Sequence, residues 1–307
     1  MRKSVVTLGT FDGLHRGHRA LLGKVIARAR AIRGRSVALA FGLPPRHAGE
    51  PVAKPVLLTT LPEKVLGMKR LGIQRIKVLV FDRKTKSTPP EDFFRNVIVK
   101  EFGAREMVVG PKVAFGKNRA GRLALLRRLG KKYGIRIRVV PAVGIGPAQV
   151  SSRRIRALLL AGQVEAANAL LGCPYSVEGK VVHGEKRGRR LGFPTANIQP
   201  DPLKILPPGV FWVKVHKGSD FPLNRREASR GLDGLCNVGI RPTFSPQAHA
   251  LHYEVYVLNK TARLYGRSLR VVFLRRLRAE RRFASPQALK RQIVRDLLIA
   301  RRWMSAA

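Results

Sequence analysis

A change of pattern near residue 172 constrains the fold of this chain more than any other feature of its sequence. Before that point, short apolar runs alternate with helical periodicities; after it, apolar runs follow one another between turns rich in Gly and Pro. Alternating strands and helices predict a Rossmann-like parallel sheet with right-handed crossovers. A succession of short strands predicts a small antiparallel β-barrel. We therefore expect two domains, residues 1–172 and 173–307.

The element boundaries follow from the same periodicities. In the first half, the predicted strands are residues 4–8, 36–41, 75–81, 106–110 and 135–140, and the predicted helices are residues 18–31, 91–102, 122–133 and 151–161. In the second half, the predicted strands are residues 176–183, 210–215, 234–238, 251–258 and 268–277. A C-terminal amphipathic helix is predicted over about residues 286–303, with Ser285 as its N-cap and Pro286 in its first turn.

Composition excludes several classes of protein. Only two cysteines occur among 307 residues, and Cys173 and Cys236 lie far apart, which excludes a disulfide scaffold and a cysteine-based zinc site. No apolar run approaches the length of a membrane span, and the first residues lead directly into a strand rather than into a signal-peptide core. We expect a cytoplasmic protein with no obligate protein partner.

The charge balance is strongly basic. Lys and Arg number 61 against 18 Asp and Glu, for a formal net charge of +43. The basic residues are spread through both halves, and in the dense stretch 122–138 they flank an apolar stripe of Leu123, Leu126 and Leu129. We interpret this stretch as the solvated face of a helix. Non-specific, salt-sensitive attraction to nucleic acid or anionic lipid is still expected.

Residues 179–197, which read GKVVHGEKRGRRLGFPTAN, carry the strongest functional signal. Glycines allow a backbone to turn sharply and to approach a phosphate closely. Thr195 and Asn197 offer neutral oxygen atoms, which Mg²⁺ accepts beside phosphate oxygens. A loop with free N–H groups, cations and two oxygen ligands suits ATP·Mg²⁺, whereas its composition alone also fits a glycine-rich hairpin.

A second motif follows the first predicted strand. Residues 9–18 read GTFDGLHRGH and open the first predicted helix, so His15 and His18 can share one face of it. Gly17 leaves room for a ligand to approach the backbone between them. The N-terminus of a helix attracts phosphate, and imidazoles beside it can stabilise charge that develops on phosphorus. The motif predicts a phosphate-transfer site.

The order of residues 179–197 resembles the signature of riboflavin kinases, G-x-V-x-x-G-x-x-x-G-R-x-x-G-F-P-T-A-N. Residues 209–211 (GVF), 236–244 (CNVGIRPTF), 264–266 (LYG) and 277–280 (LRAE), followed by Phe283, continue the family order. Glu254 falls where that family keeps its catalytic glutamate, whereas Tyr256 and Asn259 stand where it often has His and Asp.

The first half, led by residues 9–18, resembles the nucleotidyltransferase superfamily and in particular the flavin adenylyltransferase half of bacterial bifunctional FAD synthetases. Residues 115–121 (FGKNRAG) and 151–156 (SSRRIR) resemble two further segments of that family. Departures from the family pattern cluster here: Pro44 stands in place of a histidine, Lys112 in place of a polar Asp or Asn, Arg122 in place of an acid and Arg153 in place of a threonine.

The resemblance implies two reactions, phosphorylation of riboflavin to FMN by ATP and adenylylation of FMN to FAD by a second ATP. In the first, Glu254 would accept the hydroxyl proton while Thr195 and Asn197 hold Mg²⁺ and phosphates. In the second, His15 and His18 would stabilise the transition state. The remaining implied ATP and phosphate contacts are Gly9, Phe11, Gly17, Ser152, Arg156, Gly179, Gly184, Gly188 and Arg189, and the implied flavin contacts are Phe115 and Arg278.

Two alternatives stay open at this point. The first is a riboflavin kinase whose first half is degenerate and only binds nucleotide. The second is a basic RNA-associated protein that reuses the H-x-G-H fold, although this explains neither residues 179–197 nor Glu254.

Overall fold

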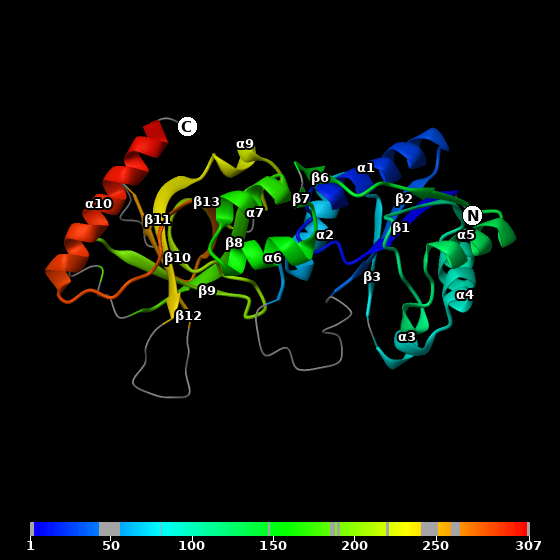
Figure 1. The fold of residues 1–307 in the computed structure, drawn as a ribbon, viewed down its shortest axis with the longest axis horizontal. Helices are drawn as coiled ribbons and strands as arrows, with labels where there is room; N and C mark the ends of the chain where they lie inside the picture. Colours follow the sequence, from blue (N-terminus) through cyan, green and yellow to red (C-terminus); the bar gives the residue numbers. More distant parts are fainter. Residues whose placement is uncertain are drawn as a thin grey trace. The chain divides into compact units, whose positions relative to one another are not determined.

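The chain forms two compact units, Met1–Ser152 and Arg153–Ala307 (Figure 1). The computed structural model describes residues 3–42, 56–80, 82–146, 148–184, 188, 191–218, 221–240, 251–258 and 265–305. The units meet in sequence at residue 152, whereas the boundary expected from the sequence lies at residue 172. Helices α6 (Ser152–Leu160) and α7 (Val164–Leu171) lie between these two positions.

A five-stranded parallel sheet, ordered β3-β2-β1-β4-β5, forms the centre of the first unit. Its strands are β1 (Ser4–Gly9), β2 (Arg35–Phe41), β3 (Arg75–Leu79), β4 (Ala104–Val109) and β5 (Arg136–Val139). All five were predicted, and each boundary shifts by at most two residues. Because β1 pairs with both β2 and β4, the strand order reverses there, which is where ligands bind in such sheets.

The predicted helices of this unit are present, and three others, Leu61–Arg70, Arg83–Ser87 and Lys117–Arg119, were not predicted. They are α1 (Arg16–Ala31), α2 (Leu61–Arg70), α3 (Arg83–Ser87), α4 (Pro90–Phe93), η2 (Phe94–Glu101), η3 (Lys117–Arg119) and α5 (Leu123–Lys132), beside a small hairpin of β6 (Gly144–Ile145) and β7 (Ala148–Gln149). The unpredicted α2 begins with a capping box, in which the Thr60 hydroxyl accepts from Glu63 N and the Glu63 carboxylate accepts from Thr60 N. That Thr-x-x-Glu spacing was the signal available in the sequence.

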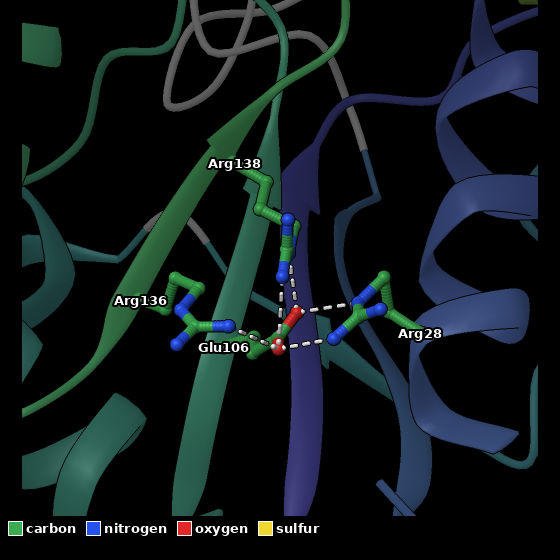
Figure 2. A network of polar contacts seen from close by, with 4 residues as sticks. All are labelled: Arg28, Glu106, Arg136 and Arg138. Atoms are coloured by element: carbon green, nitrogen blue, oxygen red, sulfur yellow. Dashed lines mark hydrogen bonds and ion pairs between the residues drawn. The ribbon is translucent and has the colours of Figure 1, made fainter. Parts of the chain in front are cut away.

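One buried acid ties β4 and β5 to α1. Figure 2 shows the Glu106 carboxylate between Arg28, Arg136 and Arg138. Arg28 Nη2 donates to Oε1 at 2.7 Å and Arg138 Nε donates to Oε2 at 2.7 Å, whereas Arg136 lies 4.0 Å away. The hydrogen bonds from Arg28 and then Arg138 outweigh the burial of the carboxylate and lower the pKa of Glu106 from 4.5 to about 2.

The sign of this shift predicts an acid-sensitive first unit. A carboxylate whose pKa is lower in the folded state stabilises the fold above pH 4.5, and this contribution is lost as the pH falls towards about 2. We expect Glu106→Gln to cost on the order of 3 kcal/mol at pH 7, at about 1.4 kcal/mol per pKa unit, and to flatten the dependence of stability on pH in that range.

Urea unfolding at several pH values, followed by far-UV circular dichroism, measures this effect. Trp212 and Trp303 are the two tryptophans of the chain and both lie in the second unit, so their fluorescence should report an unchanged transition. Glu101→Gln is the matched control, because the Lys77–Glu101 pair is about one-third exposed and should contribute less than about 1 kcal/mol. Equal acid sensitivity of Glu106→Gln and the unsubstituted chain would refute the assignment.

The second unit is a closed antiparallel barrel with the strand order β10-β11-β12-β9-β8-β13. Its strands are β8 (Tyr175–Val182), β9 (Thr195–Pro200), β10 (Gly209–Lys217), β11 (Leu232–Ile240), β12 (Leu251–Val257) and β13 (Ser268–Arg278). Five were predicted. The sixth, β9, was not among the predicted strands, and polar Thr195 and Asn197 interrupt its short apolar pattern. It pairs with β8 on one side and β12 on the other.

Helices cover parts of the barrel. The C-terminal helix α10 (Pro286–Ser305) packs Ala300, Leu297 and Trp303 on Trp212 and Leu235 of the barrel wall. The predicted cap is confirmed, since Ser285 Oγ accepts from Ala288 N at 3.2 Å. Helix α7 and the short α9 (Arg225–Ala228) were not predicted. Within the described ranges, no helix is long and apolar enough to cross a membrane.

Candidate active sites

A cavity of about 310 Å³ lies on the outer surface of the barrel. Its wall includes residues of β9, β11 and β12, then Gly188, Leu191 and Phe193 and, from α10, Leu289, Ile293 and Asp296. Among the residues expected at a functional site, it brings together Gly188, Thr195, Glu254 and Arg278. Arg189 lies outside the described residues.

Strand alternation directs Glu254 into this cavity. Its neighbours Tyr253 and Val255 are at most 2% exposed in the barrel core, so Glu254 points to the opposite side of β12. The register places Asn197 of β9 directly opposite Glu254 on one side and Asn237 of β11 opposite it on the other. Three oxygen-bearing side chains, from segments far apart in the sequence, therefore stand in one row.

The Glu254 carboxylate has two close contacts, both through Oε2. Thr195 Oγ1 donates to it at a long 3.4 Å, and His252 Nε2 lies 2.9 Å from it. Asn237 Oδ1 is buried and has no hydrogen-bond partner among the described residues. Neither His252 nor Asn237 was assigned a role from the sequence, although the period-two rule already placed His252 on the same face as Glu254.

Cys236 also lines the cavity and is fully buried. Burial, and to a lesser extent the Glu254 carboxylate, raises the pKa of its thiol well above the ordinary value. The thiol therefore stays protonated and is not a nucleophile.

The glycines of residues 179–197 allow close packing around Thr195 and Asn197. A Cβ on Gly179 would lie 2.6 Å from Gln199 O of the neighbouring strand, and a Cβ on Gly184 would overlap the Asn197 amide. Gly188 accepts backbone hydrogen bonds from Leu191 N and Phe193 N, which closes the turn before β9. The glycines of the motif thus let neighbouring backbone segments pack closely, and this packing positions the side chains of Thr195 and Asn197.

Arg278 reaches the cavity, but its guanidinium is engaged within the protein. Its Nε donates to Oδ2 of the buried Asp296 of α10 at 3.0 Å, its Nη2 lies 2.9 Å from the same oxygen, and its Nη1 donates to Ala279 O. The carboxylate also accepts from Gln292 Nε2 at 2.7 Å. Sequence reasoning missed Asp296, whose contacts fix the orientation of Arg278 and join α10 to β13.

The second cavity, of about 390 Å³, opens at the carboxyl ends of β1 and β4 in the first unit. Gly9, Phe11 and His18 line it from the β1–α1 side, and Lys112 and Phe115 line it from the segment after β4. This is the point at which the strand order reverses, so the fold and the motif predict the same ligand position.

His15 and His18 form a stacked pair at the start of α1. Their ring centroids are 3.6 Å apart, and His15 Nδ1 caps the helix by accepting from His18 N at 3.3 Å. The Phe11 ring packs edge-on against His18 at 5.4 Å. A Cβ on Gly17 would lie 3.3 Å from the His15 ring, so glycine leaves room for this arrangement.

Buried Asp12 holds the loop that carries these histidines. Its carboxylate accepts from the backbone N–H groups of Leu58 and Thr59, and Ser152 Oγ donates to its carbonyl oxygen at 2.9 Å. Asp12 was not assigned a role from the sequence. Ser152 thus adjoins the β1–α1 loop, while Arg156 lies one turn further along α6, in the second unit.

Of the four departures from the family pattern, one reaches the cavity. Lys112 lines it, with Nζ 3.5 Å from Gln149 Oε1. Arg122 is the residue before α5, and Arg153 is exposed on α6. Pro44 lies outside the described residues.

Both halves of the chain match known protein families. A family model described as FAD synthetase matches residues 1–154, and one described as riboflavin kinase matches residues 171–304. Proteins named bifunctional riboflavin kinase/FMN adenylyltransferase are similar over nearly the full chain. The one from Escherichia coli (strain K12) is 35% identical over 97% of this chain and 91% of its own length, and the one from Bacillus subtilis (strain 168) is 32% identical over 99% and 93%.

A crystal structure described as a macrolide-efflux protein from Streptococcus pneumoniae is similar in fold, with a TM-score of 0.86, 30% identity and coverage of 98% of this chain and 95% of that one. The two family models, the order of their matches and the near-complete coverage of the relatives all agree with the two cavities described above. The chain belongs to the family of bacterial bifunctional riboflavin kinase/FMN adenylyltransferases.

Proposed function

We propose that the barrel cavity phosphorylates riboflavin to FMN with ATP and that the sheet cavity adenylylates FMN to FAD with a second ATP. The observation that carries the first assignment is the Glu254 carboxylate in the barrel cavity, with the Thr195 hydroxyl on it and with Asn237 and Asn197 opposite it in the strand register. The second assignment is supported by the histidine pair at the point where the strand order reverses.

In the kinase reaction, Glu254 acts as the general base. The 5′-hydroxyl oxygen of riboflavin forms a bond to the γ-phosphorus of ATP, the bond from that phosphorus to the β,γ-bridging oxygen breaks, and ADP leaves. The hydroxyl proton passes to the Glu254 carboxylate. Phosphoryl transfer depends mainly on positioning and charge neutralisation, which a cavity lined by α10 and by Gly188, Leu191 and Phe193 can provide.

The oxygen atoms around the cavity suit Mg²⁺. Thr195 and Asn197 would hold it together with the ATP phosphates, and the unpartnered Oδ1 of Asn237 provides a further hard oxygen in the same row. The described residues contain no cluster of three or more His, Cys, Asp or Glu side chains fit for a metal, so the protein would share the ion with phosphates rather than enclose it. Bound there, Mg²⁺ would neutralise charge on the phosphates.

In the adenylyltransferase reaction, a phosphate oxygen of FMN forms a bond to the α-phosphorus of ATP, and the bond from that phosphorus to the α,β-bridging oxygen breaks to release pyrophosphate. His15 and His18 stabilise the charge that develops on the α-phosphate, beside the N–H groups that begin α1. Gly9, Phe11 and Gly17 leave room for the nucleotide, and Phe115 offers an apolar wall for the flavin. Ser152 and Arg156 are proposed phosphate contacts.

A single incubation tests both assignments. Purified protein, riboflavin, ATP and Mg²⁺ are combined, and the flavins are separated by chromatography. Accumulation of FAD is the expected result. FMN alone would indicate a kinase with a degenerate first half, which the FAD synthetase match over residues 1–154 argues against. Unchanged riboflavin would contradict both assignments.

The proposal also includes the cellular location of the protein and the consequences of its net charge. Because both reactions consume ATP, we place the enzyme in the cytoplasm. A net charge of +43 should attract ATP and FMN, and it should also cause weak, salt-sensitive association with nucleic acid.

Gly184→Ala should lower FMN formation roughly 10- to 100-fold, because the new methyl group displaces the Asn197 amide from its position. The amide is the end of a flexible side chain, so the free energy of unfolding should change by less than about 1 kcal/mol. Initial rates of riboflavin phosphorylation measure the effect. Gly23→Ala, where a Cβ meets no atom within 4 Å, is the control. A fully active Gly184→Ala variant would argue against a role for Asn197.

A further inference from the structure

His252 contacts the carboxylate that the kinase reaction needs. It lies two residues before Glu254 on β12, so both side chains point to the same face of the strand and line the barrel cavity. His252 Nε2 lies 2.9 Å from Glu254 Oε2, and the two side chains are 16% and 22% exposed. The imidazole therefore contacts the Glu254 carboxylate directly, at ion-pair distance.

The two oxygens of Glu254 are held differently. Oε2 is contacted by both His252 Nε2 and Thr195 Oγ1, whereas Oε1 accepts no hydrogen bond from the residues that the structure describes. A carboxylate fixed through one oxygen presents the other in a defined direction. Oε1 is therefore the oxygen available to a hydroxyl group in the cavity.

Arg278 and Glu280 are two further charged residues of the cavity wall. The Arg278 guanidinium is held by Asp296. The Glu280 carboxylate packs over Gly239, the residue opposite His252 in the strand register. Among the described residues, His252 thus makes the shortest polar contact to the Glu254 carboxylate.

We propose that His252 is a positioning residue of the kinase reaction, which holds Glu254 Oε2 and thereby aims Oε1 at the 5′-hydroxyl of riboflavin. The inference rests on the proposed role of Glu254 as general base. His252 keeps its proton throughout, and the hydroxyl proton is transferred to Oε1 as the new oxygen–phosphorus bond forms. Because displacement of a reacting group by about 1 Å can cost about 100-fold in rate, a loosely held carboxylate would slow the chemical step more than substrate binding.

Two substitutions at position 252 separate positioning from packing. His252→Leu removes the polar contact with Glu254 Oε2, and we expect kcat for riboflavin phosphorylation to fall roughly 10- to 100-fold while KM for riboflavin and for ATP changes less than about threefold. His252→Gln offers an amide N–H in place of the imidazole and should recover most of the lost kcat. His216→Leu is the matched control, because His216 lies on β10, bonds to Ala228 O and does not line the cavity.

The inference would be overturned if kcat of His252→Leu stayed within twofold of that of the unsubstituted enzyme, or if the substitution raised KM alone. It would also be overturned if His252→Gln were as slow as His252→Leu while both variants kept the native fluorescence of Trp212 and Trp303. Glu254→Gln is assayed in parallel. If that variant phosphorylates riboflavin at the normal rate, the proposed role of Glu254 itself fails. If it is inactive while His252→Leu is normal, only the positioning role fails.

Discussion

Glu254→Gln is expected to abolish the conversion of riboflavin to FMN and to leave the conversion of FMN to FAD unchanged. The amide has the shape of the carboxylate, so it can still contact Thr195, but it cannot accept the hydroxyl proton. General-base catalysis contributes about 10²- to 10⁴-fold in rate, and kcat for the kinase step should fall within that range. The adenylyltransferase step should be spared because His15 and His18 belong to the other compact unit.

The two steps can be measured separately by supplying either riboflavin or FMN together with ATP and following the flavin product. Glu165→Gln is the matched control, because Glu165 on α7 accepts a hydrogen bond from Arg276 N, which an amide oxygen can also accept, and does not line the cavity. Equal loss of both steps in Glu254→Gln would contradict the assignment of this residue to the kinase site alone.

His18→Ala is expected to slow the conversion of FMN to FAD and to spare the conversion of riboflavin to FMN, the reverse of the result expected for Glu254→Gln. The conversion of FMN to FAD should fall by about 10²- to 10³-fold, as when one group that stabilises transition-state charge is removed. The start of α1 should persist, because the hydrogen bond from position 18 to His15 Nδ1 is donated by the backbone. Riboflavin phosphorylation should proceed at its normal rate.

Release of pyrophosphate from FMN and ATP measures the loss, and a single-turnover experiment separates the chemical step from product release. Lys24→Ala, on an exposed position of the same helix, is the control. If His18→Ala raised only KM, the residue would contribute to substrate binding rather than to stabilisation of the transition state.

The helices and strands that could be predicted are those with a regular apolar pattern within their own residues. The five strands of the sheet are apolar runs bounded by turns, and the capping serine of α10 precedes a regular amphipathic pattern, so periodicity identified them. Helices α2, α3, η3, α7 and α9 were missed; the signal of α2 was a capping box rather than a long periodic run. Helix α7 is fixed by a tertiary contact, in which Asn168 bonds to Phe273 O and to Tyr175 N.

Within the candidate kinase site, strand β9 is the element whose secondary structure could not be predicted from the sequence. Its residues match a family signature, yet its alternation is short and polar, because Thr195 lines the cavity and Asn197 stands opposite Glu254 in the strand register. A residue placed for chemistry weakens the apolar pattern by which strands are recognised. The chemical identity of the motif could therefore be predicted, while its secondary structure could not.

By itself, the sequence determined the two architectures, their order along the chain and the residue types able to transfer phosphate, because periodicity and composition are properties of neighbouring residues. Only the tertiary structure decided which of those residues meet. The β9–β12 register brings Thr195 within hydrogen-bonding distance of Glu254, and Asp296 on α10 engages Arg278 in a partly buried ion pair. Both outcomes follow from closure of the barrel and packing of α10 on it, which join segments between 18 and 59 residues apart.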